Sequence, residues 1–156
     1  MDNLELGRRH LSNYNAGNWD EYKAQLADDV KYEEIATHTS ASGRDKYVEA
    51  VKRWKIAFPD TKAQVITEFA SGDTVISEVE WTGTHTGPLE GPLGVIQPTN
   101  KRGSLKAVLV TRFANGKIAE VRHYFDIMTM LGQLGVLSGL SAPAQTTAAE
   151  ARPSAV

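Results

Sequence analysis

The chain of 156 residues is long enough for one domain with a single hydrophobic core. Apolar residues make up 41% and charged residues 23% of it, which is typical of a globular protein and not of a disordered, fibrous or membrane chain. The formal net charge is only -2, and Lys and Arg are scattered among acidic residues, so the sequence offers no basic surface for a nucleic acid partner.

Cysteine is absent, which excludes disulfides, thiolate nucleophiles and thiolate metal ligands. The segment from Met1 to His10 is polar, and no run of about eighteen apolar residues occurs anywhere in the chain. We therefore expect a cytoplasmic protein without a secretory leader or a membrane partner.

The first part of the chain has the apolar spacing of helices. Leucines and Tyr14 recur at helical intervals from Asp2 to Ala16, which predicts a first helix. Asn18 can cap a second helix, whose apolar face runs from Trp19 to Val30. Val30 to Ile35 then favours extended structure, so we expect a short strand there.

A loop and a third helix follow. Thr37 to Gly43 is rich in Thr, Ser and Gly, which is typical of a loop. Arg44 to Phe58 carries apolar residues at helical spacing, and Pro59 ends the predicted helix.

From Lys62 onward the apolar residues alternate, as they do in strands. Turn residues at 71–73 and 115–116 divide this region into two predicted hairpins, separated by a long loop from Thr86 to Gly103. The four predicted strands are Ala63 to Ala70, Thr74 to His85, Leu105 to Ala114 and Lys117 to Phe125.

This order of elements predicts an α+β fold, in which three N-terminal helices cover the concave face of a curved antiparallel sheet. A last helical segment is expected from Ile127 to Leu134. We expect one domain over residues 1–137 and, over residues 138–156, a flexible tail or an arm that orders on a neighbouring subunit. A curved sheet facing a helix leaves a cone, whose unfilled interior would be a pocket for a hydrophobic small molecule.

Asp126 is the first candidate for chemistry, because it ends the last strand and precedes an apolar helical segment. One interpretation is a helix cap, worth roughly 1 kcal/mol to the fold. The other is an acid/base at a pocket wall, where apolar surroundings would raise the pKa of its carboxyl group. A two-residue turn at 115–116 would place Leu105 opposite Asp126, although a single bulge would reverse the inward face.

His85 ends another predicted strand, and its titration near neutrality suits proton transfer or polarisation of a carbonyl. His38 lies in a polar loop, and His123 would face outward if Asp126 faces inward. No pair of histidines has metal-ligand spacing with a carboxylate, so we expect no metal site. No Ser or Thr has the context of a nucleophile elbow.

The large aromatic residues are first of all core candidates, but some of them must line any pocket. Arg122, if it faces inward, would lower the pKa of Asp126 or bind an anionic group of the substrate. Tyr124 shares the predicted face of Asp126. The expected substrate-binding residues are therefore Tyr14, Trp54, Phe58, Phe113, Arg122 and Tyr124.

Five segments, in this order, resemble the SnoaL-like polyketide cyclases of the NTF2-like superfamily. The resemblance covers Leu4 to Gly135. The segments are Ala57-Phe58-Pro59-Asp60, Gly72-Asp73, Gly83-Thr84-His85-Thr86-Gly87, Gly116-Lys117-Ile118-Ala119-Glu120-Val121, and Asp126 with Leu131-Gly132-Gln133-Leu134-Gly135.

The resemblance implies a cone-shaped α+β barrel, a homodimer or higher homo-oligomer packed through sheet surfaces, and a pocket that needs no cofactor. In these cyclases an aspartate matching Asp126 is the acid/base of an intramolecular aldol closure. We infer that His85 would donate a hydrogen bond to the enolate oxygen. The chain departs from the family at Arg122, where a Trp is common, and in the irregular segment Leu89 to Arg102.

Four functions remain open at this point, one of them a stress-associated protein that binds no small molecule because side chains fill its cone. The leading one is an enzyme for aldol-type cyclisation, isomerisation or related proton transfer on a hydrophobic carbonyl substrate. The second is a non-catalytic module for ligand binding or assembly, with Asp126 only as a helix cap. The third is epoxide-hydrolase-like water activation, because Tyr124-Phe125-Asp126 also resembles limonene epoxide hydrolase, although an Arg-x-Asp partner has no clear counterpart in Glu78 to Thr84.

Overall fold

The structure is a computed structural model that describes residues 1–92 and 94–137. The predicted tail, 138–156, lies outside the described residues. The helices are α1 (Asn3–Ala16), α2 (Trp19–Ala24), α3 (Arg44–Ala57) and α4 (Ile127–Leu134). The strands are β1 (Leu26–Glu34), β2 (Thr39–Ser42), β3 (Lys62–Ser71), β4 (Thr74–Thr84), β5 (Leu89–Gly91), β6 (Gly94–Ile96), β7 (Arg102–Ala114) and β8 (Lys117–Phe125).

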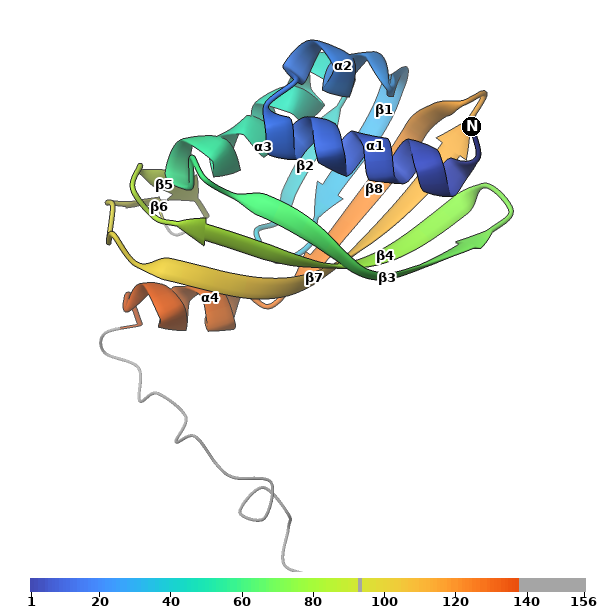
Figure 1. Cartoon of the computed structure of the whole chain (residues 1–156). Coiled ribbons are helices and arrows are strands. Elements are labelled where there is room, and N and C mark those ends of the chain that lie inside the picture. Colours follow the sequence, from blue (N-terminus) through green and yellow to red (C-terminus); the bar gives the residue numbers. More distant parts are fainter. Residues whose placement is uncertain (93, 138–156) are drawn as a thin grey trace, which may run out of the picture.

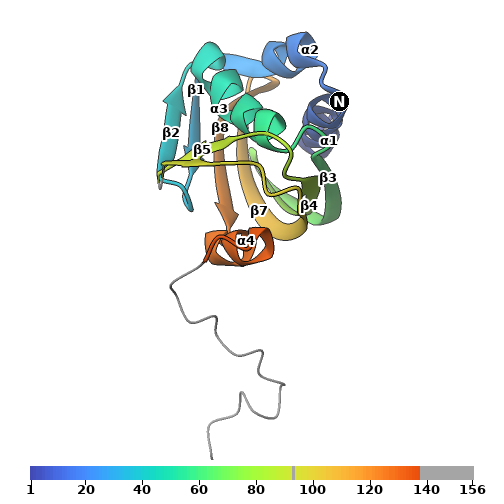
Figure 2. The same cartoon turned by 90° about the vertical axis from the view of Figure 1, so that its left-hand side faces the viewer.

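Six of the strands form one curved sheet in the order β2-β1-β8-β7-β4-β3. Its neighbouring strands are antiparallel, except that β1 and β8 run parallel. Helices α1, α2 and α3 lie on the concave side of the sheet. Helix α4 lies beside β7, below the rest of the sheet in both views (Figures 1 and 2). The predicted α+β fold, with helices on a curved sheet, is confirmed. No helix within residues 1–92 and 94–137 is long and apolar enough to cross a membrane.

The boundaries of α1 follow from local chemistry. Asp2 and Glu5 form a capping box, in which each side chain accepts a hydrogen bond from the backbone N–H of the other residue. Gly17 ends the helix in the left-handed conformation, with φ of 70°, which costs glycine little. This helix therefore begins and ends at the predicted residues, within one position.

The predicted second helix, which extended to Val30, is six residues too long. In the structure α2 ends at Ala24. Leu26 and Val30 belong to β1, where both are buried. Residues four positions apart share a face in a helix and in a strand alike, so their spacing fitted both structures. Hydrogen-bonded pairing of β1 with β2 and β8 makes this segment a strand and not a helix. The predicted loop at 37–43 accordingly contains β2.

The predicted loop from Thr86 to Gly103 also contains structure. Two three-residue strands, β5 and β6, pair within it, and β7 begins at Arg102, earlier than predicted. Such short pairings carry too few residues to show a hydrophobic period.

A bulge in β8 decides which side chains face the interior. Phe113 pairs with Ile118, but Arg112 pairs with Glu120, so Ala119 is one extra residue in β8. The pairing beyond the bulge is shifted, and Ala107 lies opposite Phe125. The predicted pairing of Leu105 with Asp126 is therefore wrong, and the inward face of β8 is reversed after Ala119.

Two clusters of buried apolar side chains hold the layers together. The larger one joins α1, α2 and α3 to the sheet around Tyr22, Tyr47 and Val75. The smaller one joins the end of α3 to α4 and contains Phe58, Leu131 and other residues. Residues of both clusters line an unfilled space inside the cone.

Candidate functional site

The unfilled space is a cavity of about 120 Å³ inside the cone. It is somewhat smaller than an engineered cavity of about 150 Å³ that binds benzene, so its size suits a ligand with one ring. Most of its wall is apolar or aromatic. Its polar lining residues include His10, Tyr14, Tyr32, Thr61, Ser77, Trp81, His123 and Gln133.

Helix α4 closes one end of this cavity. Its residues Met130, Gln133 and Leu134 line the wall. The side-chain amide of Gln133 donates to the carbonyl oxygen of Ser104 at 2.7 Å and accepts from the N–H of Ser104 at 3.0 Å. A Cβ atom on Gly103 would approach Oε1 of Gln133 to 2.8 Å, so a larger residue there would displace the end of this side chain. This pair of bonds holds the helix against β7.

His123 is the histidine that the bulge turns inward. It is buried, and it lines the cavity from β8. The indole N–H of Trp81 donates to Nε2 of His123 at 3.2 Å. Burial lowers the pKa of His123 to about 4, and the nearby charge of Glu34 opposes part of that effect. His123 is therefore neutral at pH 7.

The tautomer of His123 follows from this contact. An indole nitrogen can only donate, so Nε2 must accept and the single proton of the neutral ring lies on Nδ1. Nδ1 has no hydrogen-bond partner within the described part of the chain. The ring thus presents one N–H donor that a ligand can use.

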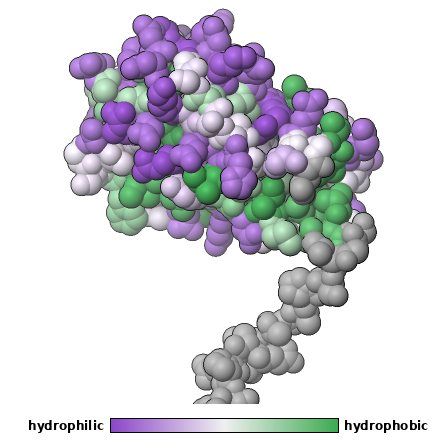
Figure 3. Space-filling model, turned by 180° about the vertical axis from the view of Figure 1, so that it is seen from behind, coloured by the Kyte–Doolittle hydropathy of each residue, from purple (hydrophilic) through white to green (hydrophobic). Residues whose placement is uncertain are grey.

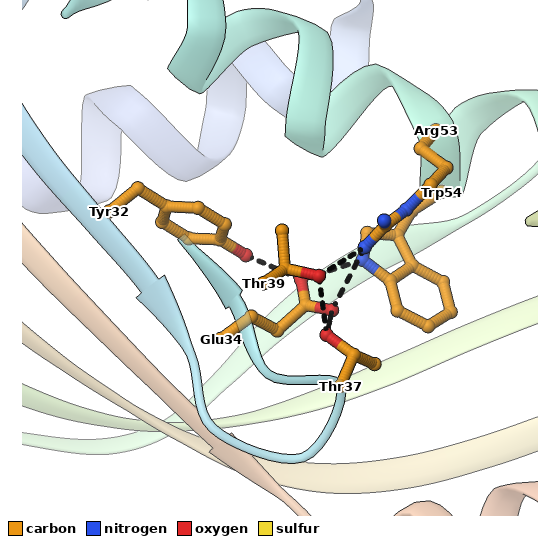
Figure 4. Close-up of polar contacts among 6 residues, drawn as sticks. All are labelled: Tyr32, Glu34, Thr37, Thr39, Arg53 and Trp54. Atoms are coloured by element: carbon orange, nitrogen blue, oxygen red, sulfur yellow. Dashed lines mark hydrogen bonds and ion pairs between the residues drawn. The ribbon is translucent and has the colours of Figure 1, made fainter. Parts of the chain in front are cut away.

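Glu34 lies on β1 as the register partner of His123 and is completely buried. Its Oε2 accepts from Tyr32 at 2.7 Å and from the indole N–H of Trp54 at 2.8 Å. Its Oε1 accepts from Thr37 at 2.5 Å and from Arg53 at 3.3 Å, as Figure 4 shows. The carboxylate does not itself line the cavity, but Tyr32 and Trp54 do.

His10 belongs to a second polar network, on α1. Gln25 donates to the carbonyl of Leu6, which fixes its amide orientation, and its Oε1 lies 3.3 Å from Nδ1 of His10. Nδ1 therefore carries the proton, and Nε2 accepts from the hydroxyl of Tyr47 at 3.4 Å. Burial lowers the pKa of His10 to about 3. Both nitrogens are occupied, so His10 offers a ligand less than His123 does.

The structure places Asp126 outside the cavity. Its carboxylate is exposed and caps α4, accepting from the backbone N–H of Thr129 at 3.2 Å and from its hydroxyl at 2.7 Å. These bonds lower the pKa of Asp126, which is opposite to the expected rise in an apolar pocket. The expected position at a pocket wall is wrong, because the bulge at Ala119 turns this face of β8 outward.

Arg122 and Tyr124 lie on the same outward face. Arg122 is half-buried and donates to Glu120 at 3.0 Å, and Tyr124 is exposed. Neither residue lines the cavity, so the expected contacts of both with a substrate there are not supported.

His85 is buried beside the cavity without lining it. Its Nδ1 accepts from the N–H of Thr99 at 3.2 Å, and its ring stacks on Phe58 with 5.1 Å between ring centres. Burial lowers its pKa. These contacts join the end of β4 to the loop before β7 and do not bring His85 to a ligand.

Three of the five expected aromatic residues line the cavity, namely Tyr14, Trp54 and Phe58. Phe113 instead packs in the larger core cluster. Sequence reasoning missed Tyr32 and Glu34, and it left the inward face of β8 undecided, with His123 outward only if Asp126 faced inward. The apolar neighbours Val121 and Phe125 at alternate positions were the signal that His123 faces the interior.

A metal centre finds no support in the described residues, where no three His, Asp or Glu side chains gather closely enough to hold an ion. The described lining of the cavity also contains no carboxylate. The site therefore consists of an apolar cavity with hydrogen-bonding groups on its wall.

Comparison with known proteins agrees with this architecture. The family model of the SnoaL-like polyketide cyclases matches residues 5–134, and the chain belongs to that family. AclR of Streptomyces galilaeus, a proposed hydroxylase, is 25% identical, with 86% of this chain and 96% of that chain covered and a TM-score of 0.73. No protein with a curated description matches the sequence.

Two further solved structures share the fold. IdmH of Streptomyces antibioticus, a proposed polyketide cyclase, is 23% identical, with 87% of this chain and 100% of that chain covered and a TM-score of 0.75. A proposed SnoaL-like polyketide cyclase of Jannaschia sp. CCS1 is 18% identical, with 85% of this chain and 90% of that chain covered and a TM-score of 0.76. The family and the fold support an enzyme-like role on a small molecule.

Proposed function

We propose that this protein binds a small hydrophobic carbonyl compound inside the cone and promotes its enolisation. The observation that carries the proposal is the neutral imidazole of His123, whose Nδ1–H is left free at an apolar wall while Trp81 occupies Nε2. A donor fixed in an apolar site stabilises negative charge on a carbonyl oxygen more than water does, because the surroundings need not reorganise.

In the proposed step His123 donates its Nδ1–H to the carbonyl oxygen of the ligand. The bond between the α-carbon and its hydrogen breaks, the proton passes to a water molecule, and the electron pair forms the enolate that His123 stabilises. Water is the acceptor because the described lining offers no carboxylate. The step requires no cofactor, and His123 takes the donor role that the sequence had suggested for His85.

The same lining argues against epoxide-hydrolase-like chemistry, which needs a carboxylate to activate water. Asp126 is exposed and engaged by Thr129, so the proposal gives it only the role of a helix cap. A module that binds a ligand without turnover is the main competing function, and the experiment separates the two.

The test uses acetophenone as a one-ring ketone. We expect the wild-type protein to bind it and to accelerate exchange of its methyl protons in D2O, followed by proton NMR, relative to buffer. His123→Phe should bind more weakly and lose the acceleration, whereas Asp126→Asn should retain both. Binding without acceleration would identify a ligand-binding module, and acceleration unaffected by His123→Phe would disprove the role of His123.

We further propose that two copies of the chain associate through the convex face of the sheet. Phe69, Ile76 and Val110 are register neighbours across β3, β4 and β7, and Phe69 and Ile76 are exposed. Figure 3 shows apolar side chains gathered along the side of the molecule where the convex face and α4 lie. An exposed apolar patch of this kind favours association.

The charges beside the patch are of both signs. Glu120 lies between Arg112 and Arg122 and interacts with both. A surface that carries both positive and negative charges can complement a second copy of itself across a two-fold axis. Backbone groups in the middle of a sheet are already paired, so face-to-face packing of side chains is the expected contact.

A further inference from the structure

Tyr32 is a second polar residue on the cavity wall, and the direction of its hydrogen bond is fixed. Its hydroxyl lies 2.7 Å from Oε2 of Glu34. A carboxylate can only accept, so the hydroxyl proton of Tyr32 points to Glu34. The phenol oxygen then keeps acceptor capacity and has no proton left to donate to a ligand.

The surroundings hold Tyr32 in this state. Glu34 is tied by Thr37, Arg53 and Trp54 as well, which leaves its carboxylate little freedom to turn (Figure 4). Burial, followed by the charge and the hydrogen bond of Glu34, raises the pKa of Tyr32 well above its ordinary value. The phenol therefore remains protonated, with its proton directed away from the cavity.

Tyr32 and His123 lie near one another on the same wall. Tyr32 pairs with Val121, and Glu34 pairs with His123, across the parallel strands β1 and β8. Residues two positions apart on a strand share a face, so Tyr32 and His123 are diagonal neighbours facing the cavity. One presents an acceptor oxygen, and the other presents an N–H donor.

We infer that Tyr32, oriented by Glu34, selects ligands that carry a hydroxyl group in addition to the carbonyl that His123 binds. The hydroxyl of the ligand donates to the phenol oxygen of Tyr32. An ether or a second carbonyl at that place would set two acceptor oxygens against each other and leave both without a hydrogen bond. The inference rests on the proposed function for the carbonyl contact and adds a second anchor to it.

The size of the cavity, about 120 Å³, makes one-ring hydroxy ketones suitable probes. The experiment measures dissociation constants by titration calorimetry for acetophenone and for its 2-, 3- and 4-hydroxy and 2-, 3- and 4-methoxy derivatives. At least one hydroxy isomer should bind roughly three- to ten-fold more tightly than acetophenone, as expected for one buried hydrogen bond. Its methoxy counterpart should bind more weakly than acetophenone.

Tyr32→Phe should remove the preference for the hydroxy isomer, so that the ratio of its dissociation constant to that of acetophenone rises to about one or above. Tyr14→Phe is the matched control, because Tyr14 also lines the cavity as a buried tyrosine but has no hydrogen bond to Glu34 among the described contacts. This variant should keep the preference. If Tyr32→Phe does not fold, the comparison of each hydroxy isomer with acetophenone on the wild type still tests the inference, because equal or weaker binding of all three hydroxy isomers would disprove the selection.

The outcomes distinguish this inference from the proposed function. If acetophenone binds in a manner that depends on His123, and no hydroxy isomer binds more tightly, the selection by Tyr32 is disproved while the carbonyl contact stands. If the hydroxy preference disappears in Tyr32→Phe but no ligand exchanges its protons faster than in buffer, the selection is supported and the catalytic proposal fails.

Discussion

The indole N–H of Trp81 on β4 donates to Nε2 of His123 on β8 across a distance of 3.2 Å. This bond joins two strands that are separated by β7 in the sheet, so the curvature of the sheet brings the two side chains together over the cavity. Its effect is chemical as well as structural, because it assigns the acceptor to one nitrogen of His123 and the donor to the other.

Trp81→Phe should therefore change the tautomer of His123. Without the indole donor, Nε2 is free to carry the proton, and the donor at Nδ1 is no longer fixed. We expect the affinity for acetophenone to fall about five-fold, corresponding to about 1 kcal/mol for one hydrogen bond. Nitrogen-15 NMR of the imidazole reports the tautomer directly.

Trp54→Phe is the control for Trp81→Phe. Trp54 also lines the cavity, and its loss removes a similar volume, but its N–H donates to Glu34. This variant should keep the Nδ1–H tautomer of His123. An unchanged tautomer in Trp81→Phe would contradict the assignment.

Asp126→Asn should leave stability and ketone binding nearly unchanged. Asn caps helices about as well as Asp, and the side chain lies outside the cavity. Asp126→Ala should destabilise the fold by about 1 kcal/mol through loss of the cap to Thr129, again without affecting affinity. Urea unfolding and calorimetry measure the two quantities. A large loss of affinity in Asp126→Asn would restore a role for this carboxylate in the site.

Burial of His10 and His123 makes stability depend on pH. Their pKa values are lowered from 6.5 to about 3 and about 4, so below pH 6.5 the unfolded chain binds protons that the folded chain does not. The free energy of unfolding should therefore fall as pH decreases from 6.5 to 4.5. Each histidine contributes at most about 1.4 kcal/mol per pH unit, and His85, whose pKa is also lowered, acts in the same direction.

Urea unfolding at intervals between pH 7 and 4.5 measures this dependence. The lowered pKa values of Asp45, Asp60 and Asp126 act below this range, because stability that comes from a depressed carboxyl pKa is lost only at lower pH. His10→Gln should reduce the slope. Equal stability at pH 7 and pH 4.5 would show that these histidines are not buried in the neutral form.

Most of the fold could be predicted because its signals are local or strictly periodic. The apolar spacing of α1, the turn at Asn115 and the alternation of β4 each depend on a few neighbouring residues. The additional strands β2, β5 and β6 depend on pairing with partners elsewhere, and three or four residues do not show a period.

The site was harder to predict, because one extra residue in β8 determines which side chains of this strand face the cavity. The bulge at Ala119 places His123 inside and Asp126 outside, and Ala119 is an unremarkable alanine in sequence. Glu34 was not predicted as part of the site for a different reason. A lone carboxylate in a strand is normally solvated, and only the approach of Arg53 and Trp54 from α3 makes its burial favourable.

Gly87→Ala should destabilise the fold by more than about 2 kcal/mol. A Cβ atom at this position would lie 2.0 Å from the carbonyl oxygen of Ile56, and backbone cannot yield as a flexible side chain can. The close approach allows the N–H groups of Thr86 and Gly87 to donate to the carbonyl oxygen of Ala57, each at 3.1 Å.

Gly91→Ala is the matched control for Gly87→Ala, because a Cβ atom on Gly91 would meet nothing within 4 Å. Its effect should stay within about 0.5 kcal/mol. Thermal or urea unfolding compares the two variants. Equal stability of both would mean that the segment between β4 and β5 does not lie against the end of α3 in solution.

The proposed dimer predicts that a charge in the middle of the convex face separates the two copies. Ile76 lies between Phe69 and Val110 in the register of the sheet and is 45% exposed, so Ile76→Lys would remain solvated in the monomer. In a face-to-face dimer the same ammonium group would be buried against apolar side chains without a partner, which costs several kcal/mol. Sedimentation should therefore show a monomer for this variant and a dimer for the wild type.

Ile56→Lys separates this effect from a general gain in solubility. Ile56 is exposed on α3, which covers the opposite, concave side of the sheet, and its replacement adds the same charge. This variant should sediment as the wild type does. If both lysine variants remain dimeric, the convex face is not the contact; if both become monomeric, net charge and not the position of the patch controls association. A monomer for Ile76→Lys alone is the result that the register of Phe69, Ile76 and Val110 predicts.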